Sequence, residues 1–497
     1  MKIKKKTPWE AAWYLLVFAF LYVWFTQVHP LVVFDADDWT YLTPDREAWP
    51  IWGEWNPAKV FPEVFMPMCS TVGSFLLMPI VKDYITVMTI THGFVVSISV
   101  TIYIHALVQL LKRLFSLDSL ATVYAGALFL VFQFLAMRHE ETDNLYLLYC
   151  KDLNCYYNYL IPALLNSSLV LWMVKNEKYE EFLKSGSPSS KGLFLLVLYM
   201  AIFSNLVDSV ILAVYAGANL LFGLLKQIKK FRLNVYVKEH LFFLGIFATW
   251  LLSAVFELSG GRAGASASGS LLRRLKDSAY CLFEVLKNCN PLFLAVCTIT
   301  VIAAAVFFFQ NRKHDIEFCQ LGVLWLVSIA AMVFCMVVLC ALVSPSYMYR
   351  AEYLFGVFFY CIVFVMLCFG YLVQNLPKIL MILPILLCIL VSETDTKEKT
   401  FQESNMGNLD PAICADISRD LLQQVSTACE AGQTEMDLYV PLWDTEDNWP
   451  HATQLMDRMR YALYAHKIIG YPIDITIVPS EKVNQSFHLD IPLYYPG

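Results

Sequence analysis

The chain has 497 residues, of which 58% are hydrophobic and only 16% are charged, and its mean hydropathy is +0.54. Roughly a quarter of the residues in soluble proteins are charged, so this composition excludes an ordinary soluble domain and indicates an all-α, polytopic membrane protein. The net charge of −6 and the absence of a basic domain argue against nucleic acid as a partner.

The chain begins with a basic segment that is followed by an apolar run. Lysines at positions 2, 4, 5 and 6 precede an apolar run that ends at Val28. This run is long for the apolar part of a signal peptide, and no small-residue cleavage site follows it. We therefore predict an uncleaved transmembrane helix over residues 9–29, with its N-terminus in the cytoplasm.

Later apolar runs predict the rest of the membrane region. The run over residues 192–225 is too long for one span and predicts two short helices that meet at the polar turn 204–209. The other runs predict one helix each, over residues 84–111, 118–137, 157–174, 239–257, 291–309, 318–343, 354–374 and 376–391. Lys and Arg collect in the loops that this series assigns to the cytoplasm. The positive-inside rule therefore favours about eleven transmembrane helices, with the N-terminus inside and the C-terminus outside.

Two longer segments are expected on the outer face. The first is the loop 30–83, in which the apolar stretch 64–81 predicts a helix that lies at the membrane interface or dips into the membrane. The transmembrane domain then covers residues 1–391, and the more polar segment 392–497 predicts a small α/β extracytoplasmic domain. Its patterns predict helices over residues 411–429 and 451–466 and strands over residues 436–440 and 473–478.

Cysteine is frequent, with 14 residues in the chain. Half of these lie within apolar helices, where a thiol behaves as a small hydrophobic group. The outer segments hold three near pairs that are candidate disulfides, because disulfides persist outside the cytoplasm: Cys150–Cys155, Cys281–Cys289 and Cys414–Cys429. Free thiols are the alternative.

An acidic cluster directly follows the first predicted membrane helix. Asp35, Asp37 and Asp38 lie within four residues, beside Trp39 and Tyr41. On an extended segment, Asp35 and Asp37 would share one side and Asp38 would face the other. A carboxylate shielded by aromatic rings has a raised pKa, which suits a general base for an acceptor hydroxyl. The alternative is a solvated acidic turn below an interfacial aromatic belt.

Two further polar groups are expected on the same face. Residues 138–143 include Glu140 and Glu141, which could bind a divalent cation, although a solvated loop cap is the commoner arrangement. Asn158 and Tyr159 begin the helix over 157–174 and could stack on and hydrogen-bond a sugar. An aromatic belt is the alternative for the tyrosine.

A third set of polar residues lies at other outer helix ends. Asn205 and Asp208 lie in the turn 204–209, where buried polar groups need partners and are expected to line a cavity. Arg262 and Arg350 each follow a long apolar helix, and a guanidinium fork suits a phosphate group. The alternative for each arginine is a side chain that reaches out to lipid headgroups.

These residues resemble the pattern of the GT-C superfamily of multi-pass glycosyltransferases. The resemblance rests on the acidic motif Asp35-Ala36-Asp37-Asp38 in the first outer loop and on an outer C-terminal domain. The chain is also similar to an uncharacterised group of bacterial GT-C-like proteins through Asp37-Asp38-Trp39 and Asn158-Tyr159-Leu160-Ile161-Pro162. The resemblance implies an active site on the outer face. The expected absence of a cleavable targeting segment and the compact outer loops fit a bacterial plasma membrane.

The resemblance implies an inverting transfer of a sugar from a polyprenyl-phosphate carrier to a cell-surface glycan, lipid or protein. Asp37 or Asp38 would deprotonate the acceptor, and Arg262 or Arg350 would hold the lipid phosphate. Asp35 would complete the acidic motif, while Trp39, Tyr41, Asn158, Tyr159, Asn205 and Asp208 would contact substrate. Some members of the superfamily use a divalent metal ion. Mg²⁺ or Mn²⁺ is therefore a candidate cofactor, with Asp37, Asp38, Glu140 and Glu141 as its ligands.

Three other functions remain open at the sequence level. A transporter or flippase of lipid-linked sugars would also place acids and arginines in a cavity, but it should show internal repeats. A polysaccharide polymerase or ligase would use arginines against a lipid pyrophosphate, with its main loop late in the membrane region. A non-catalytic assembly protein is the third, and the concentration of charged residues in the outer loops weighs against it.

Overall fold

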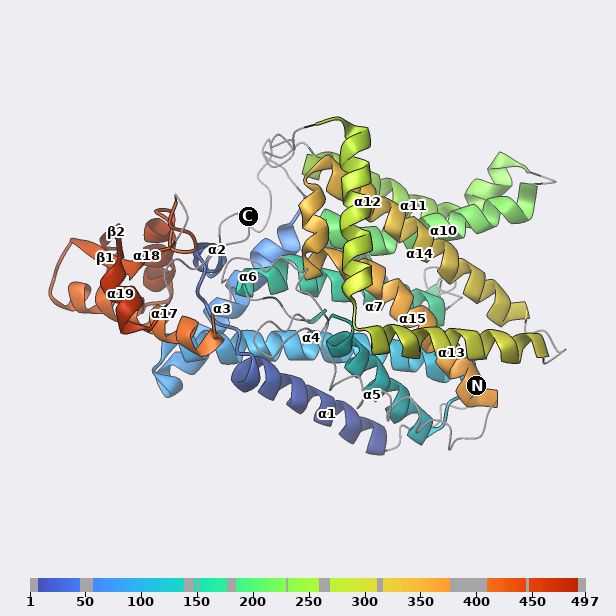
Figure 1. The fold of residues 1–497 in the computed structure, drawn as a ribbon, viewed down its shortest axis with the longest axis horizontal. Coiled ribbons are helices and arrows are strands. Elements are labelled where there is room, and N and C mark those ends of the chain that lie inside the picture. Colours follow the sequence, from blue (N-terminus) through green and yellow to red (C-terminus); the bar gives the residue numbers. More distant parts are fainter. Residues whose placement is uncertain are drawn as a thin grey trace.

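The computed structural model describes residues 8–44, 57–137, 147–148, 150, 152–176, 185–228, 231–258, 269–310, 316–375, 409–443 and 447–489. Within these ranges, nine helical segments are long and apolar enough to cross a membrane. Most of the helices form one elongated body, and a small domain built from the C-terminal residues lies at one end of it (Figure 1). The chain is therefore a polytopic helical membrane protein.

The nine candidate spans account for most of the helical body. The first combines α1 (Pro8–Val23) with the π-helix η1 (Trp24–Val28), and the fourth combines α6 (Leu153–Cys155), the π-helix η2 (Tyr156–Leu160) and α7 (Ile161–Lys175). The others are α3 (Val60–Val81), α4 (Tyr84–Phe115), α10 (Leu206–Gln227), α11 (Leu233–Leu258), α13 (Pro291–Gln310), α14 (Ile316–Leu342) and α15 (Ala351–Asn375).

The remaining helices of the body are shorter or less apolar. The helices α5 (Ser119–Leu135) and α9 (Pro188–Ile202) are apolar but shorter than the spans above. Three more elements complete the body, namely α2 (Ala36–Tyr41), the amphipathic α12 (Leu271–Asn288) and the 3₁₀-helix η5 (Pro345–Tyr349). The predicted helix over 376–391 lies outside the described residues.

The segment 192–225 forms two helices, as predicted, but they are not both short. The first helix, α9, ends at Ile202, and Asn205 caps the start of α10, which continues for 22 residues. The non-helical turn is therefore limited to residues 203–205, and Asp208 lies in the first turn of α10 rather than in the loop. The Asn205 side chain accepts a hydrogen bond from the backbone N–H of Val207, which explains where this helix begins.

The centre of the body is α4, a helix of 32 residues. It packs against α1, α3, α5, α7 and α15. Near its C-terminal end, Lys112 forms an ion pair with Glu10 at the start of α1. The two helices are therefore antiparallel.

Helix α3 is long enough to span a membrane, yet its contacts favour a helix that lies across one end of the bundle. At its start, the backbone N–H of Lys59 donates to the carbonyl oxygen of Phe203, and Lys59 Nζ lies 3.5 Å from Glu257 at the end of α11. Near its other end, Ser74 Oγ donates to the carbonyl oxygen of His466 in the C-terminal domain. These contacts place both ends of α3 near one end of the body, as expected for an interfacial helix.

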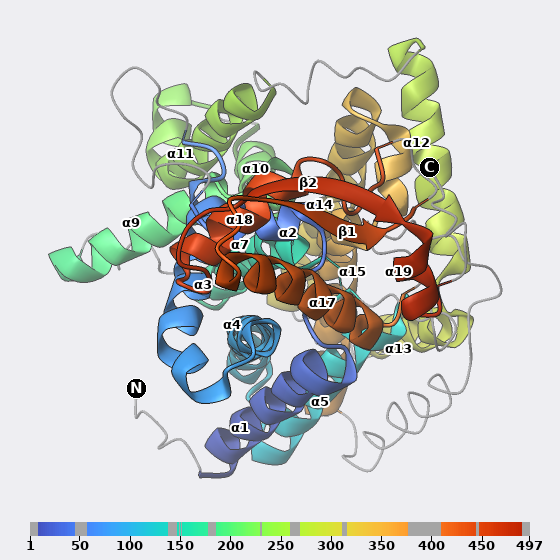
Figure 2. The same ribbon diagram turned by 90° about the vertical axis from the view of Figure 1, so that its left-hand side faces the viewer.

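The C-terminal domain contains a two-stranded parallel sheet with three helices. Its elements are α17 (Pro411–Glu430), β1 (Glu435–Pro441), α18 (Leu455–Ala465), β2 (Asp474–Ser480) and α19 (Glu481–Ser486). The strands pair in register from Glu435 opposite Asp474 to Pro441 opposite Ser480, and α18 lies in the crossover between them. Figure 2 shows α17 and α18 beside the sheet. The predicted small α/β unit is thus confirmed, and α19 is an addition.

The candidate disulfides are wrong, because none of their six cysteines forms a disulfide bond. Cys414 and Cys429 both lie on α17, about 22 Å apart along the helix axis, which is too far for a disulfide. Cys281 and Cys289 lie about 12 Å apart along α12. The two cysteines of each of these pairs are close in sequence, but they are too far apart for a disulfide because both lie on the same helix.

Candidate functional site

The acidic cluster is helical, which corrects the expectation of an extended segment. Asp35 is the N-cap of α2, and its Oδ1 accepts a hydrogen bond of 2.8 Å from the backbone N–H of Asp37. Asp38, at the third helical position, accepts in return from the backbone N–H of Asp35 at 3.1 Å. This reciprocal pair is a capping box, which ends the extended chain at residue 35 and starts the short helix. Asp35 and Asp38 thus face each other.

Asp38 is held by three backbone N–H groups. Its Oδ2 accepts from Phe34 and Asp35, both at 3.1 Å, and its Oδ1 accepts from Asn154 at 2.7 Å. The side chain is fully buried. Because both oxygens are engaged by donors of the main chain, Asp38 is an anchor that ties the first outer loop to the segment before α7.

Asp35 is equally buried but has fewer partners. Its Oδ2 has no hydrogen-bond partner among the described residues. Burial raises the pKa of Asp35 well above its usual value, and the nearby carboxylates of Asp152 and Asp38 raise it further. Burial and Asp152 also raise the pKa of Asp38, but its backbone donors oppose the rise. The backbone N–H of Asp37 likewise opposes the rise at Asp35, so burial and the neighbouring carboxylates raise the pKa of both members of the pair.

The other residues of α2 differ in their access to solvent. Asp37 and Tyr41 are half-buried, whereas Trp39 is fully buried. The Trp39 ring packs parallel to the ring of Tyr84, with a centroid distance of 6.2 Å. Trp39 therefore belongs to the core in this structure, and Asp37 is the acid of the cluster with most access to a substrate.

The segment 152–160 connects the acidic cluster to the rest of the site. It includes the π-helix η2, and single π-turns inside α-helices are often found at functional sites. Asn158 and Tyr159 lie in this π-helix and are half-buried. The Nδ2 of Asn205 donates to the carbonyl oxygen of Asn158 at 2.8 Å. Two groups predicted from separate parts of the sequence, the Asn158–Tyr159 pair and Asn205, are thus brought together.

Arg350 approaches the same segment from the start of α15. Its Nη1 lies 3.9 Å from Glu352 Oε1, and its guanidinium lies 5.1 Å from the centre of the Tyr347 ring. Although burial opposes the charge, the Glu352 carboxylate raises the pKa of Arg350, and the hydroxyl of Tyr159 also contributes. Its side chain is 25% exposed, so Arg350 is partly accessible.

Several charged side chains influence the thiol of Cys150. Burial raises the pKa of its thiol, and Glu352, Asp152 and Asp208 raise it further, while Arg350 opposes them. These electrostatic effects indicate that the four charged side chains lie in the neighbourhood of Cys150. Asp208 is 1% exposed, and its Oδ2 has no hydrogen-bond partner among the described residues. The site is therefore a buried, mainly acidic centre with one cation at its edge.

Two members of this centre were not predicted from the sequence. Asp152 lies two residues before Asn154, and Glu352 lies two residues after Arg350. Each occurs at the start of an apolar helix, where a carboxylate is usually interpreted as a favourable charge near the helix N-terminus. Their proximity to the acidic cluster depends on contacts between distant segments, which a single sequence does not reveal.

The remaining predicted site residues cannot be placed. Arg262, Glu140 and Glu141 lie outside the described residues. Within the described ranges, no group of three or more His, Cys, Asp or Glu side chains has the geometry of a metal site. Both oxygens of Asp38 accept hydrogen bonds from backbone groups. Among the described members of the predicted ligand set, Asp37 is the half-exposed residue.

The C-terminal domain contacts the acidic loop directly. The backbone N–H of Ala36 donates to the carbonyl oxygen of Pro450, and Ser418 Oγ donates to the carbonyl oxygen of Val33 at 2.6 Å. The ring of Phe34 lies 4.8 Å from the ring of His451. The loop that carries Asp35, Asp37 and Asp38 is therefore held between the membrane helices and this domain.

These observations define the class of the protein as a polytopic helical membrane protein with a small α/β unit near its C-terminus. Its acidic centre lies where that unit meets the helices. Comparisons of the chain with protein-family models, with curated proteins and with solved structures find no match.

Proposed function

We propose that the protein is a membrane glycosyltransferase of the GT-C type. It transfers a hexose or a pentose from a polyprenyl-phosphate carrier to a glycan, lipid or protein at the outer face of a bacterial plasma membrane. The observation that supports the proposal is that the segment holding Asn158 and Tyr159 is hydrogen-bonded to Asp38, the neighbour of Asp37, and to Asn205. The Tyr159 ring also lies 5.6 Å from the ring of Tyr353, three residues after Arg350. An acid, sugar-binding groups and a cation are the components that such a transfer requires.

Asp37 is the proposed general base. It is half-buried, whereas Asp35 and Asp38 are fully buried and Asp38 is engaged by backbone donors. In the reaction, the Asp37 carboxylate takes the proton of the acceptor hydroxyl, and the resulting oxygen attacks the anomeric carbon of the sugar. The bond between that carbon and the carrier phosphate breaks, so the configuration at the anomeric carbon is inverted.

Arg350 is the proposed partner of the departing phosphate. A guanidinium can donate two parallel hydrogen bonds to phosphate oxygens, and its positive charge stabilises the negative charge that develops there. Arg350 already sits beside Glu352 at a distance longer than a hydrogen bond, and its Nε has no partner among the described residues. The buried Nε donor is therefore not satisfied by the described part of the protein. Arg262 is proposed for the same role from the sequence.

A transfer assay in proteoliposomes tests this function. Lipid-linked sugars are supplied to the purified protein, and acceptor glycosylation is measured for the wild type and for Asp37→Asn, Arg350→Ala and Arg262→Ala. We expect Asp37→Asn to lower the rate by about 10²–10⁴-fold, the range typical of a general base. We expect Arg350→Ala to lower it by a similar factor.

Matched controls separate the chemistry from effects on folding. Asp437→Asn and Arg273→Ala remove the same charges from exposed positions on β1 and α12, and both should retain full activity. If Asp37→Asn and Arg350→Ala are folded and also retain full transfer, the proposed site is wrong. If the vesicles move the lipid-linked sugar across the bilayer without any transfer, the protein is a transporter.

A further inference from the structure

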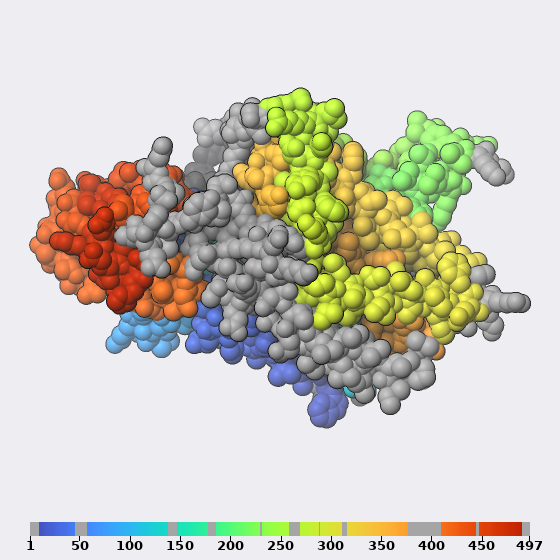
Figure 3. Space-filling model, in the orientation of Figure 1, coloured from blue at the N-terminus to red at the C-terminus, as the bar shows by residue number. Residues whose placement is uncertain are grey.

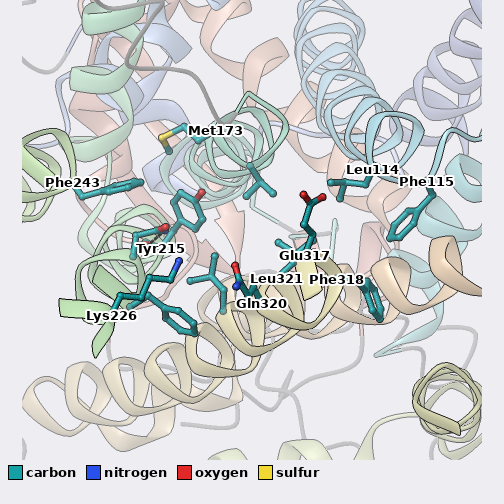
Figure 4. A pocket seen from close by; sticks show the side chains of 14 residues that line it. Leu114, Phe115, Met173, Tyr215, Lys226, Phe243, Glu317, Phe318, Gln320 and Leu321 are labelled. Atoms are coloured by element: carbon teal, nitrogen blue, oxygen red, sulfur yellow. Dashed lines mark hydrogen bonds between the residues drawn. The ribbon is translucent and has the colours of Figure 1, made fainter. Parts of the chain in front are cut away.

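The structure also contains a cavity that lies far from the acidic centre. It has a volume of about 490 Å³ and is lined by the C-terminal ends of α4, α7 and α10, by the middle of α11 and by the first turns of α14. Figure 4 shows its lining side chains. None of the predicted site residues contributes to it. A ligand bound here would therefore be separate from the proposed glycosyl transfer.

The position of this cavity along the helices fits a lipid headgroup layer. Asp208, in the first turn of α10, belongs to the acidic centre, and Lys226, in its last turn, lines the cavity. The two residues are about 27 Å apart along the helix axis, which is close to the thickness of the hydrocarbon core. The cavity thus lies at the opposite membrane surface. In Figure 3 the ends of α10 and α11 stand apart from α14 at this end of the molecule.

Two opposite charges line the cavity without neutralising each other. Lys226 extends from α10 and Glu317 from α14, and Figure 4 shows them on different sides of the cavity. Among the described residues, neither side chain forms an ion pair. Asn219 and Gln320 add polar groups along the same lining. A ligand that matches this lining must present both a negative and a positive group.

The rest of the lining is apolar and aromatic. Phe115 and Phe318 lie on the Glu317 side of the cavity, and their rings are 6.1 Å apart. Aromatic faces beside a carboxylate attract an ammonium group. Leu324 and Phe243, which line the cavity deeper along their helices, offer a surface for hydrocarbon chains.

We propose that this cavity binds the headgroup of a zwitterionic glycerophospholipid. Lys226 holds the phosphate, Glu317 holds the ammonium group together with the rings of Phe115 and Phe318, and the acyl chains lie along the apolar lining. An anionic lipid such as phosphatidylglycerol would satisfy Lys226 but has no ammonium group for Glu317. The arrangement therefore selects for a headgroup that carries both charges.

Lipid-dependent thermal stability of the purified, detergent-solubilised protein tests the proposal. The probes are phosphatidylethanolamine, phosphatidylcholine and phosphatidylglycerol with identical acyl chains. We expect both zwitterionic lipids to raise the unfolding temperature at lower concentration than phosphatidylglycerol, because a ligand that binds the folded state stabilises it. An equal effect of all three lipids, or a preference for phosphatidylglycerol, would overturn the proposal.

Charge variants supply the sharper test. Lys226→Glu and Glu317→Lys should each weaken the effect of phosphatidylethanolamine about tenfold in concentration, which corresponds to the loss of one charge-assisted contact. The double variant Lys226→Glu/Glu317→Lys keeps both charges in exchanged positions and should regain the preference for zwitterionic lipids. Lys238→Glu, at an exposed position of α11 outside the cavity, is the matched control and should behave as the wild type. Single variants that keep the full preference would contradict the assignment.

Discussion

Asp37 and Asp38 are neighbours in sequence, yet their surroundings assign them different roles. Asp38 accepts hydrogen bonds from Phe34, Asp35 and Asn154, and its side chain is fully buried. Asp37 is half-buried at the second position of α2. A buried carboxylate that fills its acceptor positions with backbone donors stabilises a loop, whereas a partly exposed one can meet a substrate.

A pair of conservative substitutions distinguishes these roles. Asp38→Asn replaces one acceptor oxygen with an N–H₂ group that faces backbone donors, so we expect the free energy of unfolding to fall by about 1–3 kcal/mol. Asp37 is half-buried and does not hold three backbone donors, so we expect Asp37→Asn to lower the free energy of unfolding by less than Asp38→Asn does. Denaturant unfolding in mild detergent measures both values. Equal losses for the two variants would contradict the assignment of Asp38 as the anchor.

At the scale of the element, the site depends on how its short helices begin. Asn205 is an example, because its two side-chain atoms serve different segments. Its Oδ1 caps α10 through the N–H of Val207 at 2.9 Å, and its Nδ2 donates to Asn158 in the π-helix η2 at 2.8 Å. One side chain therefore fixes the start of a membrane helix and the position of a predicted sugar-binding residue.

Two substitutions at Asn205 separate the cap from the link to η2. Asn205→Ser retains an oxygen that can cap α10 but loses the donor to Asn158, whereas Asn205→Ala loses both. We expect the alanine variant to be less stable than the serine variant by about 1 kcal/mol, the usual contribution of an N-cap. Denaturant unfolding compares the two variants. If they are equally stable, the cap contributes nothing to the stability of α10.

At the scale of the whole molecule, the C-terminal domain contacts the helical body through charged, polar and aromatic residues. Arg419 pairs with Asp83 at 2.9 Å, and the Tyr84 hydroxyl lies 2.6 Å from Nδ1 of His466. His451 is fully buried beside Phe34, and Trp443 Nε1 donates to its Nδ1 at 3.4 Å. Buried, uncharged histidines at this contact make the docking sensitive to acid.

The pH dependence of stability tests the role of His451. Burial lowers the pKa of His451 to about 3, while an exposed histidine titrates near 6.5. Because the unfolded state binds the proton first, this contribution to stability is present above about pH 6.5 and is lost as the pH falls towards 3. At pH 5 we expect a loss of about 2 kcal/mol from this residue.

Thermal unfolding at pH 7 and pH 5 provides the measurement. The variant His451→Phe keeps an aromatic ring and loses the titration, so its unfolding temperature should depend less on pH than that of the wild type. It is expected to start lower at pH 7, because the hydrogen bond from Trp443 is lost. His488→Asn, at an exposed position, is the control and should retain the pH dependence of the wild type.

Much of this architecture can be predicted from the sequence, because an apolar run of sufficient length has few alternatives to a membrane helix. The α/β pattern of residues 411–480 was equally clear. The helical form of residues 36–41 was missed, although Asp35 and Asp38 have the spacing of a capping box. Acidic residues also favour turns, so this signal is ambiguous on its own.

Contacts between distant segments account for the rest of what was missed. Two examples are the hydrogen bond from Asn154 to Asp38 and the electrostatic effect of Glu352 on Cys150. In both pairs the residues are far apart in the sequence. Hydropathy carries no information about such pairs. The same limit applies to the cavity at the opposite membrane surface, because Lys226 and Glu317 each look like an ordinary charge at a helix end.

The contact between the C-terminal domain and the acidic loop also determines when the site can form during synthesis. The ribosome makes residues 33–38 near the beginning of translation, but their partners Ser418 and Pro450 emerge only after the described membrane helices. The first outer loop therefore cannot reach the arrangement described above until most of the chain has been synthesised. A nascent protein that is still being inserted into the membrane cannot hold its acidic loop in place, so the site becomes complete only late in biogenesis.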